Sequence, residues 1–343
     1  MDTHAAPTAR PPAVRGGLRR HESLLTLLAL TVLVFAAMAW WVPSGRFLRP
    51  ANFEGLSYVA PELGLLAVAT MVAMLTGGID LSVIGVANLA GILAGLLFHW
   101  LAGAPRGPEL AGLAIPWVAA GVGCALLVGA LAGWLNGVLV ARLRLTPILA
   151  TIGTGQIFTG IALVLTGGPA ITGFPSGWQA LGGGTLLGLA GPLWVLLGFA
   201  LCVGVLLSRT VWGQTLTLIG SGARAAEFAG LRTARAVTLS YVLAGVLAAA
   251  AGVLLSARTN AAKSDYGTSY LLQAVLVAVL AGTNPAGGRG SVPAVLLALC
   301  TLMLLSSGFQ LMRFSNFLVD FIWGATLLGS MALGALLRQN KGR

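Results

Sequence analysis

Charged residues, histidines and cysteines are all scarce in this sequence, and the shortage excludes several classes of protein. Only 8% of the 343 residues are charged, whereas soluble globular proteins have roughly 25%. The three histidines are scattered, and each of the three cysteines sits inside an apolar run, where packing is its expected role: Cys124, Cys202 and Cys300. Neither a metal site nor a disulfide framework is expected.

Catalytic motifs are also missing. The chain has no GxxxxGK[ST] phosphate loop, so it is not expected to hydrolyse ATP itself. It has no HExxH and no GxSxG motif either, which leaves no catalytic constellation. No run of carboxylates lies within the apolar segments, which argues against a proton-coupled pump. The sequence therefore predicts a protein that is not an enzyme and carries no cofactor of its own.

Long apolar runs dominate what is present. Hydrophobic residues make up 57% of the chain, and most runs are long enough to cross a bilayer as a helix. The predicted fold is an all-α polytopic membrane protein of about ten transmembrane helices, some of them interrupted. A disordered tail is expected at 1–23, a single membrane domain at 24–337 and a second tail at 338–343. The ten predicted spans are 24–41, 56–75, 83–101, 115–140, 147–166, 192–207, 236–255, 270–280, 292–311 and 317–337.

The distribution of basic residues predicts the orientation. With the N-terminus inside, fourteen basic residues fall on the inner face: Arg10, Arg15, Arg19, Arg20, Arg142, Arg144, Arg209, Arg224, Arg232, Arg235, Arg289, Arg338, Lys341 and Arg343. Six fall on the outer face: Arg46, Arg49, Arg106, Arg258, Lys263 and Arg313. This excess satisfies the positive-inside rule and places both termini, with the segment 209–235, in the cytoplasm.

The segment 209–235 (RTVWGQTLTLIGSGARAAEFAGLRTAR) is the most polar stretch between two apolar runs. Ser221 is positioned to cap a short helix over 223–229, and Gly230 to end it. So short a helix is marginal alone and needs a partner surface to be ordered. Two interpretations stand at this point: an ordinary solvated loop, or a docking element for a soluble partner.

Two stretches interrupt the apolar runs in a similar way, 76–82 (TGGIDLS) and 282–291 (GTNPAGGRGS). Backbone freed by such breaks is tolerated in a membrane only where it is buried in protein or lines a water-filled path. Paired Gly/Pro interruptions are typical of a transport route. The candidate path residues are Gly77, Gly78, Asp80, Ser82, Asn136, Thr151, Gln156 and Asn284, with a second helix-break loop at Gly287, Gly288, Arg289 and Gly290.

Several polar residues near the spans have competing interpretations. Asp80 is placed either to cap the following helix or to act on a substrate or gate. Asp320 is expected at the membrane interface, and Asn136 and Gln156 are expected to bridge helices. Glycines at four-residue spacing, Gly129, Gly133 and Gly137, predict close helix packing.

Taken together, five segments make the chain resemble the permease subunits of bacterial ABC importers for ribose, xylose, galactose and related sugars, including autoinducer-2 importers. They are 76–83 (TGGIDLSV), 133–140 (GWLNGVLV), 146–168 (TPILATIGTGQIFTGIALVLTGG), 213–230 and 281–292 (AGTNPAGGRGSV). They occur in the family's order across most of 50–335. Ala281 departs from the family's usual glycine, and Asn284-Pro285 replaces the more common serine-containing pair. These departures bear on the sugar rather than on the class.

The resemblance implies a multi-pass protein of the bacterial inner membrane. Its partners would be two cytoplasmic ATPase subunits that bind ATP, a periplasmic or tethered sugar-binding protein and a second, identical or different, permease. By the same likeness, 220–231 would be the coupling helix region in a groove of the ATPase. The residues assigned to this role are Gly220, Ser221, Arg224, Glu227, Phe228, Gly230 and Leu231.

Other functions remain in competition. A nucleoside or branched-chain amino acid permease of the same superfamily fits the same motifs. A secondary transporter would need coupling-ion ligands in the membrane, for which Asp80 and Asp320 are the candidates. A membrane enzyme is disfavoured by the missing catalytic residues.

Overall fold

The structure, a computed structural model, describes residues 16–103 and 115–339. Each of the ten predicted spans is a helix: α1 Gly16–Trp41, α2 Pro50–Met74, α3 Val83–Ala102, α5 Ile115–Ala141, α6 Pro147–Thr166, α8 Gly191–Arg209, α11 Thr233–Thr259, α12 Thr268–Leu280, α13 Val292–Leu311 and α14 Asn316–Gln339. Eight of them contain an apolar stretch long enough to cross a membrane, and α12 and the 317–329 part of α14 are shorter apolar helices. The all-α, polytopic prediction is confirmed.

Short elements connect these helices. They are the 3-10 turn η1 Pro43–Leu48, the helices α7 Ser176–Gly183, α9 Val211–Ser221 and α10 Ala223–Phe228, and the two-residue strands β1 Ile171–Thr172, β2 Thr185–Leu186, β3 Leu189–Ala190 and β4 Ala261–Ala262. Strand β1 pairs antiparallel with β4, and β2 with β3. The pairing of β1 with β4 ties the long connection after α6 to the end of α11.

Local sequence sets where the long helices begin and end. Pro50, Pro147 and Pro192 occupy the first turn of α2, α6 and α8, where a missing amide hydrogen is harmless. Helices α3 and α6 stop at Gly103 and Gly167, whose φ angles of 63° and 65° favour glycine.

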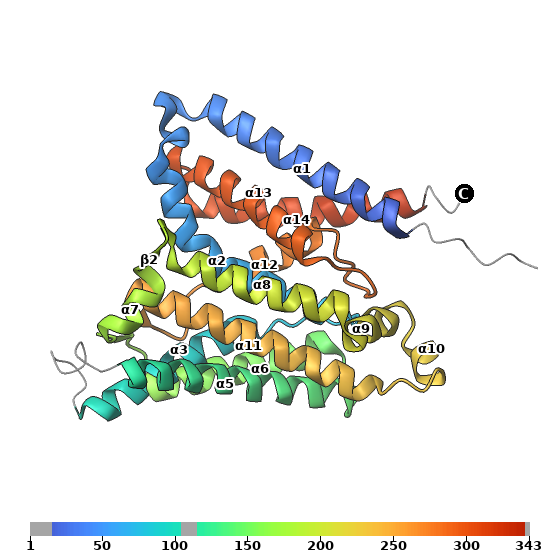
Figure 1. Cartoon of the computed structure of the whole chain (residues 1–343), viewed down its shortest axis with the longest axis horizontal. Coiled ribbons are helices and arrows are strands. Elements are labelled where there is room, and N and C mark those ends of the chain that lie inside the picture. The colour runs from blue at the N-terminus through green and yellow to red at the C-terminus, as the bar shows by residue number, and fades with distance from the viewer. Residues whose placement is uncertain (1–15, 104–114, 340–343) are drawn as a thin grey trace, which may run out of the picture.

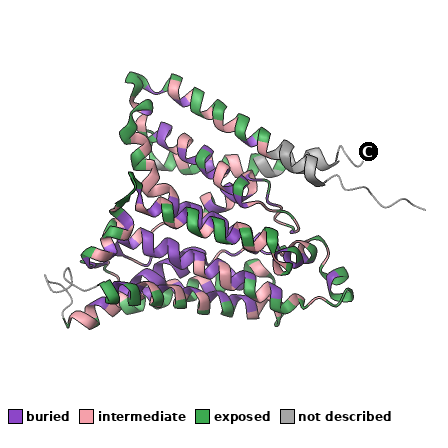
Figure 2. Ribbon diagram, viewed as in Figure 1, coloured by how far each residue is buried: buried purple, intermediate pink, exposed green. Residues whose placement is uncertain are grey.

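Helix α11 is the centre of the bundle. It packs against α5, α2 and α3, and buried residues concentrate along these middle helices (Figures 1 and 2). The predicted close packing by glycines is confirmed: a Cβ at Gly133 would overlap the Tyr241 carbonyl of α11, and one at Gly137 would lie 2.7 Å from the Thr238 Cα. Backbone-to-backbone contact between α5 and α11 therefore depends on small residues.

The bundle has two ends, named here by the short helices that mark them. At the α10 end lie α9, α10, the start of α1 and the last turns of α14, whereas α7 and β2 mark the α7 end (Figure 1). Helix α1 begins at Gly16, inside the range predicted as the first tail, and α14 continues to Gln339, inside the range predicted as the second. The predictions for Arg10, Arg15, Arg106, Lys341 and Arg343 fall outside the described residues.

Candidate functional site

The first interruption, between α2 and α3, is a buried turn built around Asp80. Its carboxylate Oδ1 accepts hydrogen bonds from the Ser82 amide at 2.9 Å and from Ser82 Oγ at 2.6 Å. Both side chains are almost completely buried, at 1% and 0% exposed. Asp80 therefore binds the residue that precedes the first turn of α3, which agrees with the capping interpretation, although the N-cap residue Ser82 makes no side-chain cap of its own.

A chain of hydrogen bonds connects this turn to α5 and α6. Asn136 Nδ2 donates to Ser82 Oγ at 2.7 Å, and Thr154 Oγ1 donates to Asn136 Oδ1 at 2.6 Å. Thr151 Oγ1 accepts from the Leu81 amide at 3.1 Å. These groups are buried and satisfied by one another, so the predicted bridging role of Asn136 is confirmed and the turn is held rigidly in this conformation.

The second interruption, 282–291, is a compact loop folded on Asn284. The Asn284 amide donates to the Arg289 carbonyl at 3.1 Å, and Asn284 Nδ2 donates to the Gly287 carbonyl at 2.8 Å. Gly287 and Gly288 have φ angles of 99° and 82°, a region that favours glycine. Gly290 lies against Met71 of α2 and against Leu75, the residue after that helix, and Arg289 is exposed.

The two interruptions lie side by side at the α10 end. The Gly288 amide donates to the Leu75 carbonyl at 3.0 Å, directly before the first interruption. A Cβ at Gly77 would lie 3.1 Å from the Ala286 carbonyl oxygen. The neighbouring Gly78 is also closely packed, against the Tyr241 hydroxyl and Pro147. Both interruptions therefore lie at the same end of the bundle and contact each other through backbone atoms.

The end of α9 packs against the place where the two interruptions meet. A Cβ at Gly220 would overlap the Leu75 carbonyl oxygen and the Gly288 amide nitrogen, and one at Gly287 would lie 2.6 Å from the Gly220 Cα. We call Gly77, Gly220, Gly287 and Gly288 the glycine junction. Because these contacts are made by backbone atoms, no flexible side chain separates the segment 209–235 from either interruption.

Three unsatisfied polar groups lie in or beside the two interruptions. Four buried side-chain atoms of the described residues have no hydrogen-bond partner: Tyr241 Oη, Thr283 Oγ1, Ser291 Oγ and Trp323 Nε1. Tyr241 faces Gly78, while Thr283 and Ser291 belong to the second interruption. Such groups are rare in native proteins, so Tyr241, Thr283 and Ser291 mark a region with hydrogen-bonding capacity that this conformation does not use.

Helix α10 projects from the junction with its polar residues exposed. Arg224, Glu227 and Phe228 share one face, and Phe228 is 92% exposed. Leu231 is half-buried against the core. The helix ends as predicted, before Gly230 with its φ of 76°.

The predicted cap of this helix is wrong. Ser221 is the last residue of α9, and its hydroxyl donates back to the Thr217 carbonyl at 2.8 Å. The N-cap residue is Gly222, which has no side chain. The sequence analysis expected only one short helix in 209–235, over 223–229, and so missed α9, the element that reaches the junction.

Gln156 does not join the buried network. It is exposed on the outer face of α6 and forms no hydrogen bond with the described residues, so its predicted role as a bridge within this chain is wrong. Asp320 is exposed near the start of α14, at the α7 end, whereas Asp80 belongs to the first interruption at the α10 end. The two acidic candidates for a coupling ion therefore do not meet.

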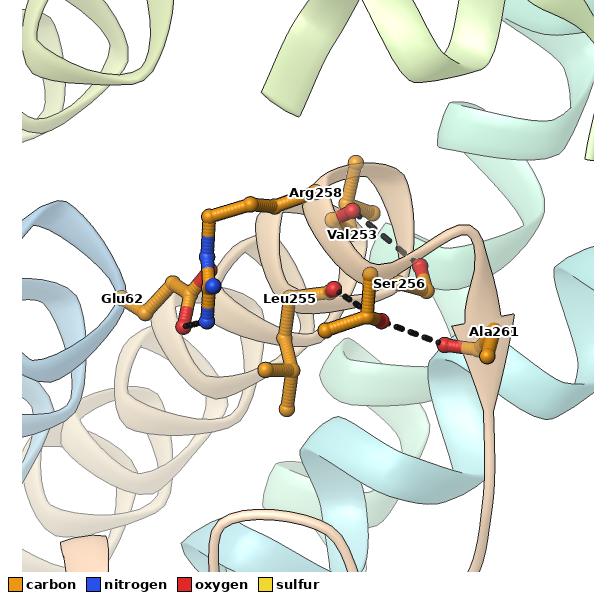
Figure 3. Close-up of polar contacts among 7 residues, drawn as sticks. Glu62, Val253, Leu255, Ser256, Arg258 and Ala261 are labelled. Carbon is orange, nitrogen blue, oxygen red and sulfur yellow. Dashed lines mark hydrogen bonds and ion pairs between the residues drawn. The ribbon is translucent and has the colours of Figure 1, made fainter. Parts of the chain in front are cut away.

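An ion pair at the α7 end escaped the sequence analysis. Arg258 Nε and Nη2 donate to Glu62 Oε1 and Oε2 at 2.6 and 3.0 Å, which joins the end of α11 to α2 (Figure 3). Glu62 is 1% exposed. An acidic residue within an apolar run was the signal that pointed to it.

The end of α11 is further fixed by polar contacts at the same place. Thr259 Oγ1 donates to the Leu255 carbonyl and to that of Ala261, beside the short strand β4 (Figure 3). Trp178 of α7 donates through Nε1 to Ser256 Oγ at 3.2 Å. Hydrogen bonds thus connect α7, α11 and the strand pair at the α7 end.

Comparisons with known proteins identify relatives along nearly the whole chain. A family model described as "Branched-chain amino acid transport system / permease component" matches residues 52–331. The autoinducer 2 import system permease protein LsrD of Yersinia enterocolitica is 35% identical over 272 residues, 78% of either chain. LsrD of Yersinia pseudotuberculosis is 32% identical over 90% of either chain, and LsrC of Salmonella typhi is 32% identical over 93% of this chain and 86% of its own. No solved structure matches the chain.

Proposed function

The chain belongs to the family of branched-chain amino acid transport system permease components, and we propose that it forms the translocation path of an ATP-driven importer for a small sugar of the autoinducer-2 type. The family description names amino acids, whereas the relatives reported above are autoinducer 2 import permeases that cover most of both chains. The relatives therefore favour the sugar. A permease of this kind is not an enzyme, and separate subunits hydrolyse the ATP.

The glycine junction is the observation that carries this proposal. The exposed face of α10 (Arg224, Glu227, Phe228) is the docking surface for a cytoplasmic ATPase subunit, and α9 connects that surface to both interruptions. Packed backbones transmit a displacement because interiors are dense and poorly compressible. Movement of α10 with the ATPase then displaces the two breaks together, and the helices on either side of them follow as rigid bodies.

The path itself runs beside the interruptions. The unused hydrogen-bonding groups of Tyr241, Thr283 and Ser291 lie there, available to a polyhydroxyl substrate once the helices separate. A substrate-binding protein outside the membrane supplies the affinity, so the permease needs only a weak polar lining. The contacts of Gly77, Gly78 and Asn284 and the hydrogen-bond network of Asp80, Ser82, Asn136 and Thr151 support their assignment to this path.

A second permease subunit covers the outer face of α6. That face carries Gln156, a polar side chain that is costly to expose to lipid. Gly153 and Gly160 lie on the same face, and a Cβ at either would meet nothing within 4 Å, so another helix has room to approach closely. The occupant is a permease of this family, identical or different, because LsrC and LsrD permeases are similar to this chain to nearly the same extent.

The orientation follows from charge and from docking. The α10 end faces the cytoplasm, where the ATPase and most basic residues lie, and the α7 end faces the binding protein. The membrane is the bacterial inner membrane, and both termini are cytoplasmic.

Co-purification tests this proposal. A tagged chain, extracted in detergent from cells that express the neighbouring genes, is expected to retain an ATPase subunit. A variant with 220–231 replaced by a flexible linker of equal length is expected to insert in the membrane but to lose that subunit. Recovery of the wild-type chain without any ATPase, together with solute transport in liposomes lacking ATP, would support an ion-coupled transporter instead.

A further inference from the structure

A groove of about 720 Å³ lies at the α10 end between α5 and α11, beneath the linker that joins α10 to α11. Three arginines from different elements line it: Arg142 at the end of α5, Arg232 in the linker and Arg235 in the first turn of α11. Trp134 of α5 and Leu239 of α11 form its apolar wall. Arg142 thus meets two arginines from a distant part of the sequence on one concave surface.

None of these arginines forms an ion pair with a carboxylate of the described residues. The ion pairs among the described residues are Arg258 with Glu62 and Lys263 with Asp265. The acidic side chain in the groove, Glu227, accepts a hydrogen bond from Thr233 at 3.3 Å. The groove therefore has an excess of positive charge, which attracts an anion.

The groove changes from charged to apolar along the helix axes. Trp134 precedes Arg142 by eight residues, a rise of ~12 Å on α5, and Leu239 follows Arg235 by four residues, a rise of ~6 Å on α11. Both apolar side chains are exposed, Trp134 at 52% and Leu239 at 44%, and both lie within spans. A cationic rim with an apolar wall below it is the polarity pattern of a phospholipid, whose charged headgroup lies above its acyl chain.

We propose that this groove binds an anionic phospholipid. The guanidinium groups of Arg142, Arg232 and Arg235 bind the headgroup phosphate, which arginine recognises through paired hydrogen bonds. One acyl chain lies along Trp134 and Leu239. Since the rim includes the linker after α10, a bound lipid holds that linker against the bundle. This inference needs the chain to span a bilayer but does not need the ATPase partner.

Native mass spectrometry of the purified full-length chain tests the site. The detergent-solubilised protein is titrated with phosphatidylglycerol, with phosphatidylcholine and with inorganic phosphate. The variant Arg142→Gln/Arg235→Gln removes two charges from the groove, and the control Arg144→Gln/Arg209→Gln removes two exposed charges from the same end outside it. At ~1 kcal/mol per arginine near an anionic headgroup, the groove variant is expected to bind phosphatidylglycerol roughly 30-fold more weakly, with the control unchanged.

Several outcomes would overturn the site. Equal retention of phosphatidylglycerol by the two double variants would show that the arginines act only as general surface charge. Equal binding of phosphatidylcholine, or tighter binding of inorganic phosphate alone, would exclude an anionic lipid as the occupant. If the groove variant kept its lipid but lost a co-purifying ATPase, the arginines would belong to the protein interface. Should the double variant not fold, the single variants Arg142→Gln and Arg144→Gln give the same comparison, with a roughly fivefold difference expected.

Discussion

Replacing Gly220 with alanine is expected to separate ATP hydrolysis from transport while leaving the ATPase bound. The new methyl group would overlap the Leu75 carbonyl oxygen and the Gly288 amide nitrogen. Both are backbone atoms, so no rotamer change relieves the overlap, and either α9 or the two interruptions must move. The docking face of α10 is exposed and does not contact this methyl group.

The size of the effect follows from the contact distances. Carbon and oxygen atoms settle at ~3.5 Å, so the end of α9 must shift by an amount on the order of 1 Å. Overpacking of this kind costs ~1–3 kcal/mol, which a folded bundle tolerates. The same shift breaks the contact between Gly288 and Leu75 through which the interruptions move together. We expect at least a tenfold loss, about 1.4 kcal/mol, in sugar imported per ATP hydrolysed.

The assay is uptake of labelled sugar by proteoliposomes that contain the permease, the ATPase and the binding protein, with phosphate release measured in parallel. Gly204→Ala in α8 is the matched control, because its methyl group would meet nothing within 4 Å and alanine favours a helix. A Gly220→Ala permease that imports sugar at the wild-type ratio to ATP would refute the junction as the coupling route. Loss of the ATPase from that variant would assign Gly220 to docking instead.

Three further predictions concern other parts of the chain. Glu227→Arg reverses the charge on the exposed face of α10 and is expected to weaken ATPase binding in pull-down assays, so unchanged binding would remove Glu227 from the docking surface. Ser82→Ala removes a buried hydroxyl that serves both a carboxylate and an amide, and is expected to lower the free energy of unfolding by ~1–3 kcal/mol in thermal melts. The control is Ser208→Ala, because Ser208 is exposed and its hydroxyl donates only to the Gly204 carbonyl of its own helix; its melting temperature should stay unchanged. Equal shifts in the melting temperatures of the Ser82 and Ser208 variants would contradict the structural role given to the Ser82 hydroxyl. Arg258→Gln leaves Glu62 buried without a counter-charge and is expected to cost ~3–5 kcal/mol by the same measurement, whereas the double variant with Glu62→Gln should recover much of that loss.

The long helices were predictable because their signals are local. An apolar run of bilayer length, started by proline or ended by glycine, specifies a helix without reference to its neighbours. All ten were placed correctly, as was the close packing of α5 on α11 through Gly133 and Gly137. The elements that escaped, α7, α9 and the strand pairs, are short, and tertiary contacts rather than composition determine them.

The candidate site was predictable in its parts but not in its assembly. The polarity of Asp80 and Asn136 and the glycines of both interruptions were visible in the sequence, and their roles in the path stay predictions. The meeting of Gly220 with Gly288 was not visible, because a backbone contact between residues 68 positions apart leaves no periodic signal. Ser221 shows the opposite failure: it satisfied a local capping rule, but α9 extends through it and uses its hydroxyl.

The most direct measurement is the ATP dependence of sugar uptake by proteoliposomes that contain this chain together with its neighbouring ATPase and binding protein. The account predicts uptake only when ATP is present on the ATPase side, abolished when 220–231 is replaced by a flexible linker. Uptake that proceeds without ATP and follows an imposed ion gradient, unaffected by that replacement, would contradict the claim that this permease is driven through α10 and the glycine junction.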